Sequence, residues 1–389
     1  MKILVYRYGS ICEPDVISTF QKMGLTVLEE TTEITNKKLS AADRLQLVEN
    51  VLKAEQPLFV FSINFYPIIA EICHIYRTRY LCWTVDAPVP ELFAKSICHD
   101  TNHLFLFDYA QYQRFAPYNP NGIHYLPLAS ATERFDKVFT TITQADRSKY
   151  SKDIAFVGSL YNEKNPLRQL KGLPEHTKGY IDGLIASSLK VYGCNFVEET
   201  LTDEITSAIK DCSNDFYTPE NAVEDSDRYV AAHSYIGMQI AETERVRTLN
   251  VLAQYFAVDL FTKSDVSGLK NVRTHGGVSS LTEMPKIFHL SKINLNMTIK
   301  PIQTGLPLRI FDILGCGGFL MTNFQSELLD FFNIGTDLEA YSSMEELVEK
   351  CAYYLEHEDI RKQIAENGYE KVCTNHTYIH RLKEMIGYL

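Results

Sequence analysis

The stretch from His275 to Asn323 constrains the fold of this chain more than any other part of the sequence. Its pattern of apolar residues, glycines and prolines predicts a glycine turn, a helix, a strand, a second helix and another strand. Strands that alternate with helices of this length indicate βαβ units in a parallel sheet. The expected elements are a helix over 281–290, a strand over 292–296, a helix that begins at Pro307 and a strand over 319–322.

The second of these helices begins with residues suited to a nucleotide. Gly305 and Pro307, with Leu306 between them, let the backbone approach a ligand at the helix N-terminus, where free N–H groups favour an anion. Arg309 adds a cation, and Asp312 adds a carboxylate that can accept hydrogen bonds from both hydroxyls of a ribose. A single glycine-rich turn occurs in any α/β domain, so the prediction of a nucleotide site depends on the whole order of motifs.

The chain resembles the donor-binding half of GT-B glycosyltransferases in that order: Gly-x-Val-Ser, a helix with Met-Pro, a strand, Gly-Leu-Pro, and a helix that ends in Cys-Gly-Gly. Within that group it is most similar to the bacterial, CgeB-like branch of spore maturation proteins. Asp312-Ile-Leu-Gly-Cys-Gly stands where the larger group carries Glu-Ala-Met-Ala-Cys-Gly, whose acidic residue binds the nucleotide ribose. The resemblance therefore implies the same role for Asp312.

The resemblance also implies a fold class: α/β, with two Rossmann-like parallel-sheet domains facing a cleft, as in GT-B enzymes. We expect an N-terminal, acceptor-side domain over 1–140, a polar linker over 141–152 and a donor-binding domain over 153–375. A long helical pattern between two strands of the second domain predicts an insertion at about 163–241. The last helix, 376–389, is expected to cross back to the first domain.

Composition limits the possible partners and the compartment. The chain has 389 residues, enough for two cores, and a net charge of −11, which disfavours nucleic acid or an anionic membrane as the main partner. No signal peptide is expected, because no basic N-terminal region precedes an apolar run. No transmembrane segment is expected, because the most apolar stretch, 57–73, is interrupted by polar residues and a proline. Nine cysteines without a Cys-x-x-Cys pair indicate reduced thiols in a cytoplasmic protein and no structural zinc. The oligomeric state is left open.

The first domain offers two candidate catalytic carboxylates. Its opening strand and loop lack the Gly-x-Gly-x-x-Gly fingerprint, so a dinucleotide is disfavoured there. Asp86 follows an apolar strand, where ligands of open parallel sheets bind, and is the main candidate for the base that deprotonates an acceptor hydroxyl. The alternative is that Asp86 serves as the N-cap of a helix that starts at Pro88. Glu13, in the first loop, is the second candidate.

Three further residues are assigned to the acceptor side. Gly9 in the first loop allows close approach of an acceptor, although a tight strand–helix turn explains it as well. Ser62 and Asn64 lie in a Ser-Ile-Asn-Phe segment that matches the N-terminal domain paired with CgeB-like donor domains. Their assignment is thus implied by the resemblance.

The resemblance assigns further donor-binding residues in the second domain. It places one strand–helix turn beside the donor phosphates, a second turn at the nucleotide base and a glutamate near the donor. These residues are Gly158 and Ser159, then His275, Gly276 and Gly277, and Glu327. It also places Arg245 at the diphosphate, and the alternative is that Arg245 forms an exposed ion pair with Glu242 or Glu244. The alternative for His275 is a side chain that is merely solvated. Lys164 and Arg168 could add charge nearby.

Two features concern metal and stereochemistry. Asp225-Ser226-Asp227 superficially matches a metal-binding Asp-x-Asp. The run lies in a polar segment and does not follow an apolar strand, so no metal site is expected. Retaining members of the larger group have a second acid eight residues before the ribose acid, and Thr304 stands there. No Asp or Glu occurs from Pro285 to Phe311. This absence favours inversion, with a base from the first domain.

The sequence therefore predicts a metal-independent glycosyltransferase that moves a sugar, hexosyl or related, from a nucleoside-diphosphate sugar to an unknown acceptor. A UDP-sugar is the expected donor substrate, no cofactor is expected, and the acceptor is a protein, a polysaccharide or another glycan. Two alternatives stay open: a nucleotide-sugar epimerase of the same architecture, and a non-catalytic nucleotide-sugar-binding protein.

Overall fold

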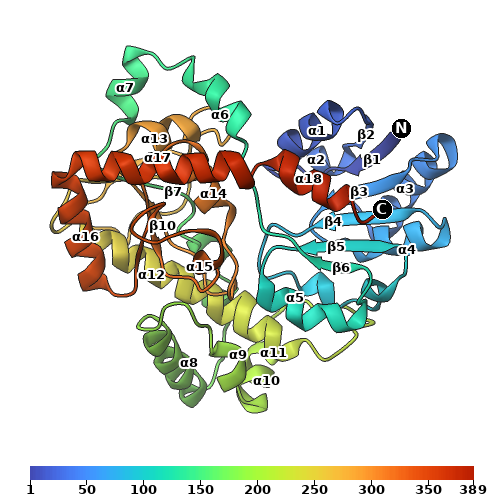
Figure 1. Ribbon diagram of the computed structural model, residues 1–389. Helices are drawn as coiled ribbons and strands as arrows, with labels where there is room; N and C mark the ends of the chain where they lie inside the picture. Colours follow the sequence, from blue (N-terminus) through green and yellow to red (C-terminus); the bar gives the residue numbers. More distant parts are fainter. The chain divides into compact units, whose positions relative to one another are not determined.

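The computed structural model describes residues 1–389, apart from the side chain of Lys164, so the charge expected from Lys164 lies outside the described residues. The chain forms two compact units (Figure 1). The first unit comprises Met1–Leu128, Tyr217–Ser226 and Tyr378–Leu389. The second unit comprises Ala129–Phe216 and Asp227–Thr377.

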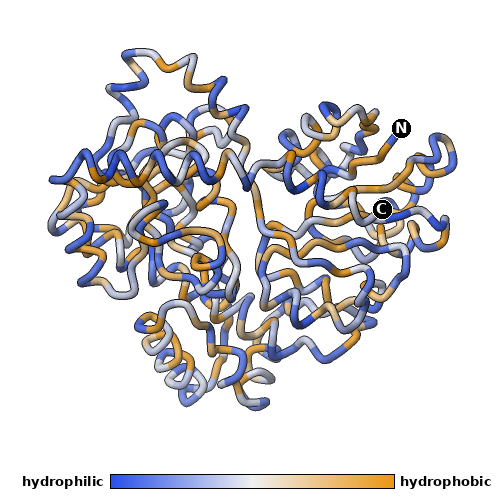
Figure 2. Tube along the Cα trace, in the orientation of Figure 1, coloured by the Kyte–Doolittle hydropathy of each residue, from blue (hydrophilic) through white to orange (hydrophobic). Residues whose placement is uncertain are grey.

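The first unit contains a six-stranded parallel sheet in the order β2-β1-β3-β4-β5-β6. The strands are β1 Lys2–Tyr6, β2 Thr26–Glu30, β3 Phe59–Ile63, β4 Arg79–Trp83, β5 Asn102–Leu106 and β6 Ile123–Tyr125. β3 is buried along its whole length, as its unbroken apolar run predicts for a central parallel strand. Figure 2 shows hydrophobic residues following the strands of this sheet.

The helices of the first unit begin where the sequence supplies a cap or a proline. Ser40 and Asp43 form a capping box at the start of α3, and α1 and α4 have a proline in their first turn. The C-terminal helix α18 packs on α1, and Tyr378 at its start contacts the ring of Trp83. The helices are α1 Glu13–Lys22, α2 Thr32–Thr35, α3 Ala41–Glu55, α4 Pro67–Ile75, α5 Tyr109–Phe115 and α18 Tyr378–Ile386, with short 3-10 turns at Pro90–Phe93, Lys95–Cys98 and Ala116–Tyr118.

The second unit contains a six-stranded parallel sheet in the order β12-β11-β10-β7-β8-β9. The strands are β7 Ile154–Val157, β8 Val258–Phe261, β9 Arg273–His275, β10 Ile293–Asn296, β11 Leu320–Asn323 and β12 Glu339–Tyr341. Its core forms around Phe156, Leu260, Leu295 and Met321, which come from four of these strands. The helices beside the sheet are α6 Thr132–Phe139, α7 Gln144–Tyr150, α13 Met284–Leu290, α14 Leu308–Gly315, α15 Leu328–Phe331, α16 Met344–Glu356 and α17 Glu358–Asn375.

A mainly helical insertion separates β7 from β8. Its elements are the 3-10 turns Asn162–Lys164 and Pro166–Gln169, α8 Glu175–Ser188, α9 Val197–Thr200, α10 Asp203–Asp211, α11 Asp227–Tyr229, a π-helix at Val230–Ile236 and α12 Gly237–Leu252. One part of the insertion, Tyr217–Ser226, belongs to the first unit. There Ala222 forms an antiparallel bridge with Ala94, and Glu224 accepts hydrogen bonds from Arg114 and Tyr118.

These observations confirm the prediction of an α/β fold with two parallel sheets and a helical insertion in the second. The unit boundaries differ from the expected ones. The polar run 141–152, expected to be a linker, is mostly helix α7, because Thr143 and Asp146 form a capping box at its start. Among the described residues, none of the helices combines the length and hydropathy needed to span a bilayer.

Candidate functional site

Each sheet reverses its direction of growth at one point. In the second unit the chain adds β8 and β9 on one side of β7 and then returns to add β10 on the other side. In the first unit it adds β2 on one side of β1 and then β3 on the other. Open parallel sheets bind ligands beyond the carboxyl ends of the strands at such a switch point. Ligands are therefore expected at the loops after β7 and β10 and at the loops after β1 and β3.

Arg245 on α12 occupies the switch point of the second unit. Its guanidinium donates from Nη1 to the carbonyl of Ser159, which follows β7, at 2.6 Å, and from Nη2 to the carbonyl of Met297, which follows β10, at 2.8 Å. The rings of Phe156 and Tyr161 lie 5.3 and 4.5 Å from its Cζ. Arg245 therefore bridges the two loops at the place where a ligand is expected.

Arg245 is a buried cation rather than a surface ion pair. Only 9% of the residue is exposed, and burial lowers the pKa of its guanidinium below the usual value. Among the described residues, its Nε is buried and has no hydrogen-bond partner. Glu242 is engaged elsewhere, by Arg168 and by the amide of Asn165. Such a cation favours an anionic group at the carboxyl ends of β7 and β10.

A buried carboxyl group lies next to Arg245 on the same helix. Burial raises the pKa of Glu244 above its ordinary value, although the charges of Lys300 and Arg245 oppose this shift. The amide of Asn323, at the end of β11, approaches it at 3.5 Å. The ends of β7, β10 and β11 thus meet charged groups presented by one helix, α12.

The turn after β7 is shaped by its contacts with this helix. The Gly158 amide donates to the carbonyl of Phe261 at 3.1 Å, and a Cβ at Gly158 would lie 3.3 Å from the Phe156 ring and 3.9 Å from Nη1 of Arg245. The Ser159 hydroxyl donates to Glu163 and accepts from the Tyr161 amide at 2.7 Å. The structure therefore places Gly158 and Ser159 against Arg245.

Arg309 and Asp312 form a pair at the start of α14. The guanidinium of Arg309 lies 3.4 Å from the Asp312 carboxylate, 5.2 Å from the centre of the Phe288 ring, and against the sulfur of Met284. Met284 and Phe288 belong to α13, so Arg309 lies between α14 and α13. Asp312 is only 5% exposed. The structure thus pairs these two predicted residues directly on α14, with Arg309 packed against α13.

The loop before α14 is fastened to the loop after β11. Glu327 is buried, and its carboxylate accepts a hydrogen bond from the Thr304 hydroxyl at 2.6 Å. Gln325 donates from its side-chain amide to the carbonyls of Ile302 at 3.1 Å and Gly305 at 3.4 Å. Leu306, the next residue, is buried. A carboxylate therefore adjoins the position at which the local sequence lacks an acid.

Sequence reasoning missed the contact between Thr304 and Glu327. The two residues are 23 positions apart, and no local spacing connects them. The available signal was the strand order, because β10 and β11 are neighbours and their following loops must meet at one edge of the sheet.

His275 is held on the sheet by its neighbours. Its Nε2 lies 2.8 Å from the Asp259 carboxylate, which also accepts from Arg273 at 2.7 Å, and its ring stacks on Phe261 at 4.5 Å. The two glycines that follow are exposed, and the Lys263 side chain lies so close to Gly277 that a Cβ there would meet it at 2.4 Å. The turn of Gly276 and Gly277 is therefore open on one side and covered by Lys263 on the other.

In the first unit, the loops after β1, β3 and β4 meet at one polar cluster. The Asn64 side-chain amide donates to the Asp86 carboxylate at 2.7 Å and to the Tyr8 hydroxyl at 3.1 Å, and its oxygen accepts from the Val85 amide at 3.0 Å. Asp86 is exposed, and the cis peptide bond between Ala87 and Pro88 follows it. Burial raises the pKa of Tyr8, and the charge of Asp86 adds to the shift.

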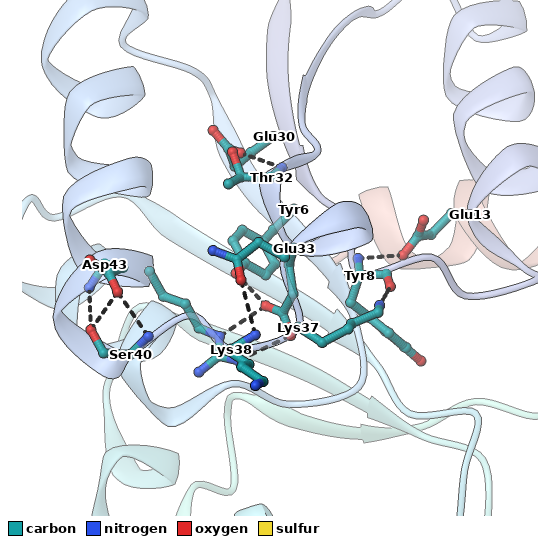
Figure 3. A network of polar contacts seen from close by, with 12 residues as sticks. Tyr6, Tyr8, Glu13, Glu30, Thr32, Glu33, Lys37, Lys38, Ser40 and Asp43 are labelled. Carbon is teal, nitrogen blue, oxygen red and sulfur yellow. Dashed lines mark hydrogen bonds and ion pairs between the residues drawn. The ribbon is translucent and has the colours of Figure 1, made fainter.

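Glu13 and Ser62 turn inward instead. The Glu13 carboxylate is 1% exposed and accepts from the Tyr8 amide at 2.9 Å (Figure 3). It also accepts from the amides of Gly9 at 3.0 Å and Ser10 at 3.1 Å. The Ser62 hydroxyl donates to the Asn64 carbonyl at 2.7 Å and lies 2.6 Å from that of Tyr80. These contacts assign Glu13 and Ser62 to shaping the loops rather than to an acceptor.

The loop shaped by Glu13 needs a glycine. Gly9 has a φ of 96°, in the region that other residues rarely adopt. Lys37 reaches across this loop, and its ammonium donates to the carbonyl of Tyr8 (Figure 3). Sequence reasoning missed both Tyr8 and Lys37, because a tyrosine beside a glycine and an exposed lysine carry no motif.

The Asp225-Ser226-Asp227 run forms no cluster of ligands. Asp227 pairs with Lys210 at 2.6 Å, and among the described residues no group of three or more His, Cys, Asp or Glu side chains could hold a metal ion.

Comparison with known proteins supports the same fold. Residues 241–387 match a family model described as glycosyl transferase-like. The chain is similar to the HepE protein of Anabaena in complex with UDP-glucose, with 10% identity, a TM-score of 0.54, and coverage of 100% of this chain and 98% of that one. It is also similar to the UDP-forming α,α-trehalose-phosphate synthase of Burkholderia xenovorans, with 9% identity, a TM-score of 0.54, and the same coverage of 100% and 98%.

A third solved structure, the sucrose-phosphate synthase of Thermosynechococcus elongatus, has 9% identity and a TM-score of 0.54, with coverage of 100% and 98%. No curated protein matches the chain at the level of sequence. The likeness at this identity shows the fold, which is the two-sheet α/β fold of GT-B glycosyltransferases.

Proposed function

We propose that this chain is a glycosyltransferase that moves a sugar from a nucleoside-diphosphate sugar to an acceptor hydroxyl. The observation that carries the proposal is Arg245. It is a buried cation at the switch point between β7 and β10, and it lies within the residues that match the glycosyl transferase-like model. An anionic leaving group needs stabilisation by fixed positive charge, and a buried, pre-oriented guanidinium supplies it at low cost of reorganisation.

The second unit is proposed to bind the donor. Arg245 and the free amides at the start of α14, near Gly305 and Leu306, would bind the diphosphate, with Arg309 beside them. Asp312 would accept hydrogen bonds from the ribose hydroxyls, and Glu327 would face the transferred sugar beside Thr304. The turns at Gly158–Ser159 and at 275–277 are proposed to border the phosphates and the base. HepE and the trehalose-phosphate synthase are described with UDP or UDP-glucose, which supports a UDP-sugar as donor.

The first unit is proposed to bind the acceptor. Asp86 is the exposed carboxylate of its polar cluster, and Asn64 orients it. In the proposed step, Asp86 takes the proton of the acceptor hydroxyl as the hydroxyl oxygen bonds to the anomeric carbon. The bond from that carbon to the phosphate oxygen breaks, and its electron pair leaves with the nucleoside diphosphate. The product would have inverted anomeric configuration, and we propose that the arginines take the place of a metal ion.

Several parts of the proposal concern the protein's setting. The resemblance to the CgeB-like branch suggests a bacterial protein. All nine cysteines are free in the structure, which supports a reducing compartment such as the cytoplasm. We propose that the first unit is the acceptor-side domain, to which the C-terminal helix returns, and that the second unit is the donor domain.

The proposal is tested by binding of nucleoside diphosphates and their sugars to the full chain. A ligand specific to the folded state raises the melting temperature, and calorimetry then gives its affinity. We expect Arg245→Met to weaken UDP binding roughly 10- to 100-fold, because charge-assisted hydrogen bonds contribute about 1.5–3 kcal/mol. Arg247→Met is the matched control, since Arg247 is exposed on the same helix.

Three outcomes would contradict the proposal. Equal affinities of the Arg245→Met and Arg247→Met variants would remove the diphosphate from the β7/β10 switch point. Conversion of the donor without any added acceptor would indicate an epimerase, and tight nucleotide binding without turnover would indicate a binding protein.

A further inference from the structure

Three tyrosines form a cluster beyond the carboxyl ends of β5 and β6 in the first unit. The ring of Tyr109, the first residue of α5, lies 5.3 Å from that of Tyr125, which ends β6, and 5.6 Å from that of Tyr112. The rings of Tyr112 and Tyr125 are 6.3 Å apart. Tyr109 is 42% exposed and the other two are half-buried, so the cluster presents aromatic surface to solvent.

The cluster lies on the same edge of the sheet as Asp86. β4, β5 and β6 are neighbours, with Trp83 opposite Phe105 and Leu106 opposite Tyr125. Asp86 follows β4, and Tyr109 follows β5. Neighbouring strands are about 4.8 Å apart, so the ends of β5 and β6 lie roughly 5 and 10 Å along the edge from the end of β4. A molecule bound at Asp86 can extend over the tyrosines if it is longer than one ring.

The charged groups around the cluster are already engaged within the protein. Arg114, on α5, pairs with Glu224 at 2.8 Å, and Arg381 donates to the carbonyl of Pro127 at 2.8 Å. Arg114 is neutralised by a carboxylate and Arg381 is only 6% exposed, so neither presents its charge at this surface to an anionic lipid or a polyanion. The surface therefore suits a neutral ligand with both apolar faces and hydroxyl groups.

A sugar ring has that chemistry. Its C–H faces pack on an aromatic ring, and its hydroxyls can pair with phenol oxygens, while tyrosine loses little conformational entropy on binding. We propose that Tyr109, Tyr112 and Tyr125 form a binding subsite for sugar rings of the acceptor, so that the acceptor is a glycan of two or more residues. This inference rests on the proposed function, because it extends the acceptor site at Asp86.

The test begins with an array of neutral glycans, from monosaccharides to hexasaccharides, exposed to the full chain. Affinities are then measured by calorimetry for the tightest binder and its shortened forms. We expect the affinity to rise with length, and Tyr109→Ala and Tyr125→Ala to lower it by about tenfold for the long form, because an aromatic contact contributes about that much. The shortest form that binds should be unaffected, since it does not reach the tyrosines.

Two control variants and one further measurement make the test specific. Tyr109→Phe keeps the ring and should keep most of the affinity, which separates stacking from a folding defect. Tyr255→Ala removes a more exposed tyrosine, 64% accessible, from the second unit and should change nothing. UDP binding, measured on the same preparations, reports on the proposed function independently.

The inference is overturned if no glycan on the array binds while UDP does, or if Tyr109→Ala and Tyr125→Ala bind the long glycan as the unchanged protein does. An acceptor that proves to be a peptide, or a lipid presented in neutral vesicles, overturns it as well. If the unchanged protein does not bind UDP, that result would instead count against the proposed function.

Discussion

Each sheet has one switch point, and the charged groups near the two switch points have opposite signs. Next to β1/β3, the exposed carboxylate of Asp86, which follows β4, is held by the amide of Asn64 beside the phenol of Tyr8. At β7/β10 a buried guanidinium, Arg245, is held by the carbonyls of Ser159 and Met297. The loops near the two switch points thus present a candidate proton acceptor in one unit and a fixed cation in the other.

The two proposed roles differ in how far each charged group is buried. A base must meet solvent and substrate protons, so an exposed carboxylate suits it. A cation that stabilises a leaving anion acts more strongly away from water, so burial suits it. If this division is correct, substitutions in the first unit should change turnover without changing donor affinity, and substitutions in the second unit should change donor affinity.

The largest effect is expected from Asp86→Asn. Loss of the general base should lower kcat by about 10²- to 10⁴-fold while the affinity for UDP stays unchanged. Steady-state rates with the donor and acceptor, together with calorimetry of UDP, measure both quantities. Asp100→Asn is the control, because Asp100 is an exposed aspartate that pairs with Arg77 just before β5. An unchanged kcat would remove Asp86 from the reaction.

Much of the architecture could be predicted from the sequence, because buried parallel strands are continuous apolar runs. β3 is one example, and β10 with the helix α14 after it is another. The unit boundaries could not be predicted in the same way. The segment at Tyr217–Ser226 contacts residues such as Ala94 that are more than a hundred positions away, and no local pattern encodes that pairing.

The same limit applies to the candidate site. The positions of Asp86 and Asn64 followed from strand ends, because the carboxyl ends of neighbouring parallel strands meet at one edge. The sequence also indicated that Glu13 lies in the first loop, but not that three backbone amides occupy its carboxylate. The sequence pattern places a residue in a particular loop, whereas the hydrogen-bond partners of its side chain depend on how the loop folds around it.

The next effect concerns the second switch point. Arg309→Ala should weaken nucleoside diphosphate binding by about 1.5–3 kcal/mol if the guanidinium makes a charge-assisted contact. Arg309→Met keeps much of the packing on Phe288 and Met284, so a similar loss in both variants would assign the effect to charge. Lys292→Met, which removes a cation paired with Asp153 at the start of β10, is the control. Unchanged UDP affinity would exclude Arg309 from the site.

A smaller effect is expected on the stability of the first unit. Glu13→Gln removes the charge that holds three backbone amides and Arg7, and should lower the free energy of unfolding by about 2 kcal/mol. The chain has one tryptophan, Trp83, which is buried in this unit, so its fluorescence during urea unfolding reports on the unit directly. Glu29→Gln is the control, because Glu29 pairs with the same arginine at a more exposed position and should cost less than about 1 kcal/mol. Equal losses would show that Arg7, and not the loop, determines the effect.

The smallest expected effect is a change in the free energy of unfolding at acidic pH, and it differs between the two units. Burial alone would raise the pKa of Glu33, but hydrogen bonds from Arg44 and Tyr6 outweigh it and hold that pKa below its ordinary value. The unfolded chain therefore takes up a proton at this carboxylate first, near pH 4.3, and the native state only at lower pH. The stability that Glu33 contributes is present above that pH and is lost as the pH falls through the native value. Urea unfolding followed by Trp83 fluorescence should show this loss of stability in the unchanged protein and a smaller loss in Glu33→Gln. Glu55→Gln is the control, because Glu55 pairs with Lys2 at the surface, and it should lose stability as the unchanged protein does. Parallel pH profiles in all three would show that Glu33 is not the group responsible.

The pKa of Glu244, near the other switch point, shifts in the opposite direction, because there burial outweighs the charges of the neighbouring cations. Protonation of the Glu244 carboxyl group should therefore not destabilise the second unit as the pH falls.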